Sequence, residues 1–228
     1  MLLIADTFVS DAYAATFDRL MTGVASKARM AVKFWRPLNR PELPDLSRFS
    51  HMILSGSEAS VVDDFPWEQP LAKALRAFIQ AKKPVLGICY SHQFIAKELL
   101  GKKHVRHSPT PEFGYRRIDF RANPLLAGIR EPLVSAVTHF DEVTDLGDEF
   151  SVLASTPDCA VQAFQMKDLP VWGVQFHPEY GPGSIEEIFA AEESSYPDFQ
   201  KRYFDDRKGD PDLAQNQRIF LNFLSVQC

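Results

Sequence analysis

The fold is decided by the stretch Pro84-Val85-Leu86-Gly87-Ile88-Cys89-Tyr90-Ser91-His92-Gln93. Residues 84–88 form a near-continuous apolar run, which is typical of a strand buried on both faces of a parallel sheet. Residues 91–100 follow with a helical pattern that ends at Gly101. A strand that passes at once into a helix places Cys89 at the carboxyl edge of the sheet, where open α/β sheets bind ligands.

Outward from this stretch, the N-terminal half of the chain alternates strands and helices. Short apolar runs predict strands at residues 1–5, 31–35 and 51–55. Apolar residues at helical spacing predict helices that begin after Ser10 and near Leu71. This alternation favours a parallel sheet that is covered by helices on both faces.

Beyond Gly101 the pattern changes to strands joined by short turns. We expect strands at residues 113–120, 133–137, 151–155, 161–166 and 171–176, and helices at residues 184–191 and 212–224. Between these helices, residues 192–210 are polar and irregular, as in a solvated loop or, alternatively, a lid or partner surface. The sequence therefore predicts an α/β fold, an open and mostly parallel sheet with an antiparallel extension, in one domain over residues 1–228.

The composition excludes several classes of protein. The chain has 228 residues, of which 45% are hydrophobic and 24% charged, as in an ordinary globular domain. A net charge of -5 disfavours nucleic-acid binding. No apolar run is long enough to span a membrane, and the start lacks a basic signal-peptide region, so we expect a cytoplasmic protein. The three cysteines form no CxxC pair, which disfavours a disulfide framework and a thiolate zinc site.

Two strand ends carry residues that can act together in nucleophilic catalysis. Cys89 sits at a predicted helix N-terminus, whose partial positive charge stabilises a thiolate and whose N–H groups can bind an oxyanion. Taken alone, Cys89 is equally well explained as a small core residue. His177 and Glu179 follow another apolar strand, and extended backbone would turn both side chains to one face. A glutamate that orients a histidine, and a histidine that takes a thiol proton, form a catalytic triad.

The motifs around these residues resemble those of one enzyme family, the class I (triad) glutamine amidotransferases. Gly87-Ile88-Cys89-Tyr90-Ser91-His92-Gln93 is similar to the family's nucleophile motif G-x-C-x-G-x-Q, and Gln175-Phe176-His177-Pro178-Glu179 matches its Q-F-H-P-E. Two weaker segments fall in the right order, Ile53-Leu54-Ser55-Gly56-Ser57 and Val137-Thr138-His139-Phe140-Asp141-Glu142-Val143. The closest variants are the glutaminase part of GMP synthetase and the free-standing γ-glutamyl peptidases.

The resemblance implies a role for each catalytic residue. Cys89 would attack the γ-carboxamide of glutamine to give a γ-glutamyl thioester and ammonia. His177 would take the thiol proton and pass it to the leaving group, and Glu179 would orient His177. Backbone N–H groups of Gly56 and Tyr90 would form the oxyanion hole.

The resemblance also implies the ligands. Gln93 and the strand residues Thr138, His139 and Phe140 would hold the glutamyl group of glutamine or of another γ-glutamyl compound. The chemistry needs no cofactor and no metal. The chain would either feed ammonia to a separate synthetase subunit or act alone on γ-glutamyl peptides or conjugates. A non-catalytic regulatory module of the same fold is the less favoured alternative, because the triad is intact.

Some residues depart from the family pattern or stand apart from it. Ser91 occupies a position that is usually glycine, which either reshapes the turn or is accommodated without consequence. Ser57-Glu58 replaces the usual Gly-Pro or Ser-Pro. His104 and His107 have a spacing that suits a metal site on a helix, but they lie in a predicted strand and loop without a well-placed carboxylate, so we expect no metal there.

Overall fold

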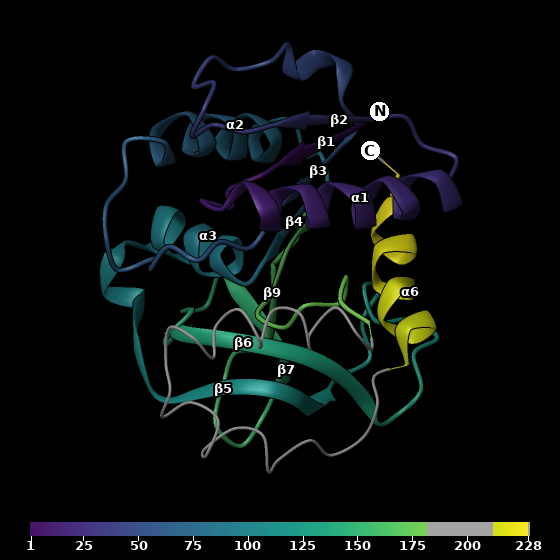
Figure 1. The fold of residues 1–228 in the computed structure, drawn as a ribbon. Helices are drawn as coiled ribbons and strands as arrows, with labels where there is room; N and C mark the ends of the chain where they lie inside the picture. Colours follow the sequence, from purple (N-terminus) through teal and green to yellow (C-terminus); the bar gives the residue numbers. More distant parts are fainter. Residues whose placement is uncertain (182–211, 228) are drawn as a thin grey trace.

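The protein is described by a computed structural model that covers residues 1–181 and 212–227. One nine-stranded sheet organises these residues (Figure 1). Its parallel part runs in the order β2 (Val32–Trp35), β1 (Leu2–Ala5), β3 (His51–Leu54), β4 (Val85–Ile88) and β9 (Val171–Val174). The antiparallel part continues from β9 through β8 (Ala163–Met166), β7 (Phe150–Ser155), β5 (Val105–Phe120) and β6 (Leu133–Val143). The predicted fold class is confirmed.

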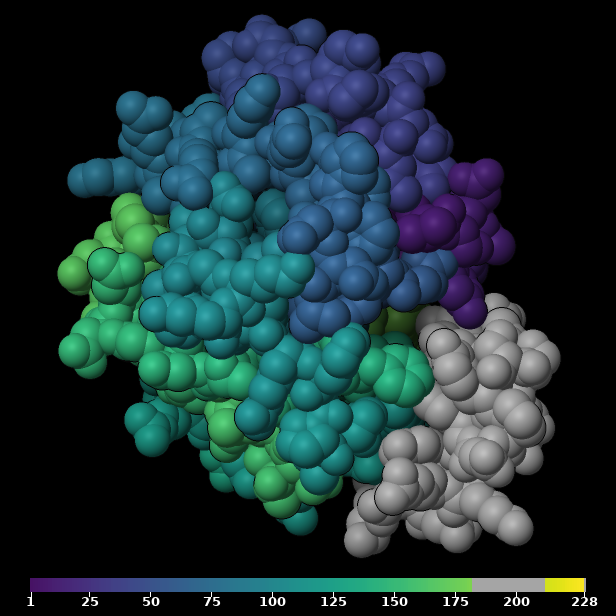
Figure 2. All heavy atoms as spheres, turned by 90° about the vertical axis from the view of Figure 1, so that its left-hand side faces the viewer, coloured from purple at the N-terminus to yellow at the C-terminus, as the bar shows by residue number. Residues whose placement is uncertain are grey.

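Four long helices cover the two faces of the parallel part. Helices α1 (Asp11–Lys27) and α6 (Leu213–Leu224) share one hydrophobic core with the side chains of Leu2 and Ile4. Helices α2 (Glu68–Gln80) and α3 (Tyr90–Leu100) share the other core with Leu3 and Ala5. Alternate residues of β1 thus enter opposite cores, as expected for a strand buried on both faces. In the side view, the blue atoms of the N-terminal part of the chain lie above most of the teal and green atoms of the later segments (Figure 2).

The structure differs from the sequence prediction mainly in strand lengths. β5 begins at Val105 and β6 extends to Val143, because the two strands keep pairing across a bulge between His107 and Glu112. β9 ends at Val174 rather than at residue 176. The helix predicted at 184–191 and the polar segment 192–210 lie outside the described residues. None of the described helices is long and apolar enough to cross a membrane.

Two glycines let α3 lie close to the centre of the sheet. Gly87 of β4 and Gly173 of β9 are paired in register. A Cβ atom on Gly87 would lie 2.6 Å from the carbonyl oxygen of Ser91, and one on Gly173 would lie 2.6 Å from Nδ1 of His92. Both contacts are impossibly short, so the approach of the nucleophile-bearing turn to the sheet depends on these two positions.

Candidate active site

Cys89 lies on a strained turn between β4 and α3. Its backbone φ is +48° and its ψ is -106°, a conformation that non-glycine residues rarely adopt. The backbone N–H of Cys89 donates to the carbonyl of Val174 at 2.8 Å, which ties the turn to the end of β9. The thiol donates to the carbonyl of Thr138 on β6 at 3.6 Å. The sharp turn predicted at Cys89 is present, and its strain is of the kind found at active sites.

His177 and Glu179 meet, although not in the way that the sequence predicted. Nδ1 of His177 donates to Oε1 of Glu179 at 2.7 Å, and both side chains are buried. Residues 175–179 lie beyond β9, and Glu179 is in a turn, so the expectation of extended backbone was wrong. The turn follows because the N–H of His177 bonds to the carbonyl of Ala136 on β6, which draws the chain away from β8.

Electrostatics and ring stacking fix the state of the His177 imidazole. Burial by itself lowers the pKa of His177, but the charge of Glu179 and the neighbouring Cys89 side chain outweigh it and raise the pKa to about 10. The ring of Tyr180 stacks on the imidazole with centroids 4.9 Å apart and planes at 22°. Nε2 of His177 has no hydrogen-bond partner other than Cys89 within the described residues. This nitrogen is thus available to a thiol or a leaving group.

The two predicted oxyanion donors lie beside these groups. A Cβ atom on Gly56 would be 3.6 Å from Cβ of Cys89 and 3.2 Å from Cε1 of His177, so the loop after β3 reaches the reacting atoms. Tyr90 follows Cys89 directly, and its phenol turns away to donate to Glu68 at 2.7 Å. The backbone N–H groups of Gly56 and Tyr90 stay predicted donors for the oxyanion.

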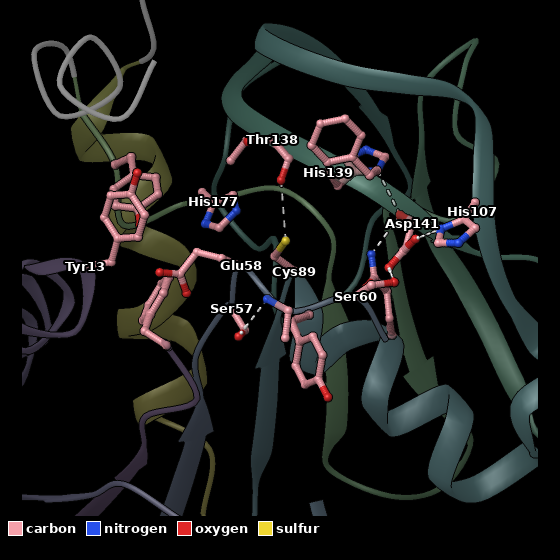
Figure 3. Close-up of a pocket in the computed structure, with 16 residues that line it drawn as sticks. Tyr13, Ser57, Glu58, Ser60, Cys89, His107, Thr138, His139, Asp141 and His177 are labelled. Atoms are coloured by element: carbon pink, nitrogen blue, oxygen red, sulfur yellow. Dashed lines mark hydrogen bonds and ion pairs between the residues drawn. The ribbon is translucent and has the colours of Figure 1, made fainter. Parts of the chain in front are cut away.

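The four residues predicted to hold the glutamyl group all line one cavity with Cys89 and His177 (Figure 3). The Gln93 amide nitrogen already donates to the carbonyl of Asp141 and to Gln175. The two ring nitrogens of His139 bond to the Asp141 carbonyl and to Glu112, at 3.0 and 3.1 Å. Gln93 and His139 therefore lie in the cavity wall, and their hydrogen bonds hold both side chains in fixed positions. A direct contact of Gln93, Thr138, His139 or Phe140 with a substrate stays a prediction.

Sequence reasoning missed three residues that organise the cavity. Asp141 accepts from the Ser60 hydroxyl at 2.6 Å, from the Val61 N–H at 3.0 Å and from His107 at 2.7 Å, which joins three segments of the wall. Tyr180 stacks on the catalytic histidine. Asp141 and Tyr180 stand inside or directly after the quoted motifs, so their position was a usable signal. Glu112 offered no signal, because its partners come from distant strands.

Two groups of potential metal ligands contain histidines that make hydrogen bonds within the described residues. His104 contacts the carbonyl of Asp145, and His107 contacts the Asp141 carboxylate, so a carboxylate does stand beside His107, contrary to expectation. Glu112, His139 and Cys159 cluster in the core. Burial, and then the charge of Glu112, raise the pKa of Cys159 to about 12.

Ser91 is fully buried in the first turn of α3, and its hydroxyl has no hydrogen-bond partner among the described residues. A buried hydroxyl without a partner costs about 1–3 kcal/mol. We therefore expect Ser91→Ala to raise the free energy of unfolding by about 1 kcal/mol or more in urea titrations. Ser26→Ala, at an exposed helical position, is the control for helix propensity alone. An equal increase in the free energy of unfolding of both variants would mean that the buried Ser91 hydroxyl does not destabilise the protein.

The family model for glutamine amidotransferase class-I matches residues 9–192, which include all the residues discussed above as catalytic. The chain belongs to the class I glutamine amidotransferases. It is therefore an enzyme of this family, and the family resemblance of its motifs is confirmed.

Named relatives of this amidotransferase include two GMP synthases. The chain is 37% identical over 147 residues to the glutamine-hydrolysing GMP synthase of Phocaeicola vulgatus, a match that covers 60% of this chain and 27% of that protein. It is 36% identical over 144 residues to a subunit of the glutamine-hydrolysing GMP synthase of Saccharolobus solfataricus, covering 63% of this chain and 73% of that one. The match thus spans about a quarter of the length of the first relative.

The fold of this amidotransferase is also found in a solved structure. A glutamine amidotransferase of Thermotoga maritima superposes with a TM-score of 0.79 at 14% identity, covering 99% of each chain. At this level of identity the likeness concerns the fold alone.

Proposed function

We propose that this amidotransferase hydrolyses the γ-amide of glutamine or of a related γ-glutamyl compound through a thioester on Cys89. The observation that carries the proposal is the meeting of Cys89 and the His177–Glu179 pair at one cavity, with Nε2 of His177 left without another partner among the described residues. We further propose that residues 1–228 form a single amidotransferase domain.

The proposed reaction uses these groups in sequence. The Cys89 sulfur attacks the amide carbon after its proton passes to Nε2 of His177. The N–H groups of Gly56 and Tyr90 would bind the oxyanion of the tetrahedral intermediate. The carbon–nitrogen bond breaks as His177 returns the proton to the departing amine. Water, activated by the same imidazole, then cleaves the thioester and releases glutamate. Glu179 stabilises the imidazolium at both stages.

Selective alkylation tests the assignment of the nucleophile. A glutamine-like diazo-ketone should modify Cys89 and abolish turnover, and mass spectrometry of tryptic peptides locates the label. Cys159 should be spared because it is buried and its pKa is raised to about 12. Iodoacetamide under denaturing conditions is the control that all cysteine peptides can be detected. Equal labelling of Cys89, Cys159 and Cys228 in the folded protein would overturn the assignment.

The fate of the amine divides the proposal into two forms. One relative is a subunit of a glutamine-hydrolysing GMP synthase, and by analogy the ammonia would pass to a separate synthetase subunit. In the other form the chain acts alone, and the leaving group is a larger amine. The cavity volume of about 570 Å³ gives the second form the room that a larger leaving amine needs.

A further inference from the structure

The cavity around Cys89 is larger than the reaction of glutamine alone requires. Its volume is about 570 Å³, within the range of about 300–1,000 Å³ that accommodates drug-sized ligands. Cys89 does not lie at its end. In Figure 3, Glu58, Tyr13 and His177 lie on one side of the sulfur, and Asp141, Ser60 and His107 lie on the other. A substrate whose amide carbon reaches the sulfur can therefore extend in both directions.

The position of His177 assigns the two arms of the cavity. His177 must give its proton to the departing nitrogen, so the leaving amine lies on the side of the imidazole. The glutamyl part then points toward Asp141, on the side where the predicted residues Gln93 and His139 also line the wall. The arm with Tyr13 and Glu58 is thus the leaving-group arm.

Aromatic rings and one carboxylate make up the leaving-group arm. Phe8 and Tyr180 are 4% and 3% exposed and line the same cavity, where Tyr180 stacks on His177. The Phe8 and Tyr13 rings lie 6.2 Å apart between centroids. Aromatic faces bind alkyl chains and attract cations. The arm can therefore take a larger amine than ammonia.

Glu58 supplies the carboxylate of this arm. Its Oε2 accepts from the N–H of Val9 and its Oε1 from the N–H of Ser10, each at 3.0 Å. These bonds fix the carboxylate while each oxygen keeps a second lone pair for a ligand. The side chain is exposed to solvent. Glu58 stands where the family motif usually has proline, so the carboxylate is a property of this chain.

The one described cavity residue whose pKa is raised toward a cation, His177, is already paired with Glu179 at 2.7 Å rather than with Glu58. None of the sixteen described residues that line the cavity is lysine or arginine. The Asp141 carboxylate is already engaged by Ser60, Val61 and His107. Glu58 is thus an available anion in the leaving-group arm, where it attracts an ammonium group and repels a carboxylate.

We infer that the substrates are γ-glutamyl conjugates of diamines or other amines that carry a second positive charge, rather than γ-glutamyl amino acids. The inference rests on the proposed function and specifies its substrate class. The Cys89 sulfur replaces the amine on the carbonyl carbon of the γ-amide, and the amine departs with the proton from His177. Water then hydrolyses the thioester to glutamate and frees the thiol. The ammonium end of the departing amine contacts Glu58 and the aromatic rings.

Three amides that differ in one terminal group test the inference. The γ-glutamyl amide of 1,4-diaminobutane ends in an ammonium, that of n-pentylamine carries a methyl group in its place, and that of 4-aminobutanoate ends in a carboxylate. We expect kcat/KM for the ammonium amide to exceed that for the methyl amide by about fivefold, and the carboxylate amide to be slowest. Glutamate release is measured for all three, with glutamine as the reference substrate.

Glu58→Gln should bring the ratio of kcat/KM for the ammonium amide to that for the methyl amide to about 1, because the charge that attracts the ammonium is lost. Any general effect of the substitution on the loop changes both kcat/KM values and cancels in this ratio. Glu42→Gln, which removes an exposed carboxylate outside the cavity lining, should keep the preference. A wild-type ratio near one, or a ratio that survives in Glu58→Gln, would overturn the inference. Failure of the proposed function is a different result: neither glutamine nor any amide is hydrolysed, and the diazo-ketone does not label Cys89.

Discussion

Cys89→Ser and His177→Asn are each expected to lower kcat for glutamine hydrolysis by about 10⁴-fold or more. Serine leaves an alcohol that the buried imidazole cannot activate to the same extent, and asparagine removes the group that moves the proton. Glu179→Gln retains an acceptor for Nδ1 of His177 but loses the charge that raises the imidazole pKa, so we expect a loss of about 10²- to 10⁴-fold. Ammonia release, coupled to reductive amination of 2-oxoglutarate, measures all three.

Matched substitutions outside the triad make this result interpretable. Cys228→Ser changes a cysteine outside both sequence motifs, and His104→Asn changes a histidine that does not line the described cavity. Both variants should retain wild-type kcat. The midpoint of urea unfolding of each inactive variant should also stay close to that of the wild type. Any difference should be no larger than a single buried substitution normally causes. A Cys89→Ser variant that kept a tenth of the wild-type kcat would exclude the thioester mechanism.

Gly87→Ala is expected to impair both stability and catalysis. Its Cβ would lie 2.6 Å from the Ser91 carbonyl oxygen and 2.7 Å from Cδ1 of Ile95, and the first of these atoms is backbone that cannot rotate away. Helix α3 must then move off the sheet and carry Cys89 with it. We expect a loss of about 1–3 kcal/mol in the free energy of unfolding. We also expect a fall of about 10²-fold in kcat/KM, because small displacements of a reacting group have large effects.

Gly23→Ala is the matched control for this substitution. Gly23 lies in α1, and nothing stands within 4 Å of the position that its Cβ would take. Alanine there should stabilise the protein by about 0.5–1 kcal/mol, because it favours the helix more than glycine does. Urea titrations and steady-state kinetics of both variants test the argument. Wild-type kinetics for Gly87→Ala would show that the close approach of α3 is not needed for catalysis.

The parts of the molecule that sequence predicted well are those set by local patterns. The apolar run before Cys89 has the composition of a strand buried on two faces, and such a strand can hardly lie anywhere but in the middle of a sheet. The pairing of His177 with Glu179 was also predictable, because two residues so close in sequence can meet in several backbone conformations. That tolerance is why the contact is present although the backbone turns where extension was expected.

What sequence could not predict depends on partners that lie far apart along the chain. Glu112 is bonded to His139, Thr156 and Gln162, which come from other strands and turns, and an isolated glutamate in a strand gives no sign of such burial. The length of β5 was underestimated for a similar reason. Residues 105–112 are too polar to indicate a strand by themselves, and their pairing with β6 decides their conformation.

β9 is the last strand of the described chain, yet it lies between β4 and β8 in the middle of the sheet. As a nascent chain leaves the ribosome, β4 therefore keeps an open apolar edge until residues 171–174 have been made and inserted. An open edge of this kind invites pairing with other chains, and its closure by a distant segment is slow. The newly made chain thus carries its thiol before its base, and the catalytic pair needs the segment that follows β9.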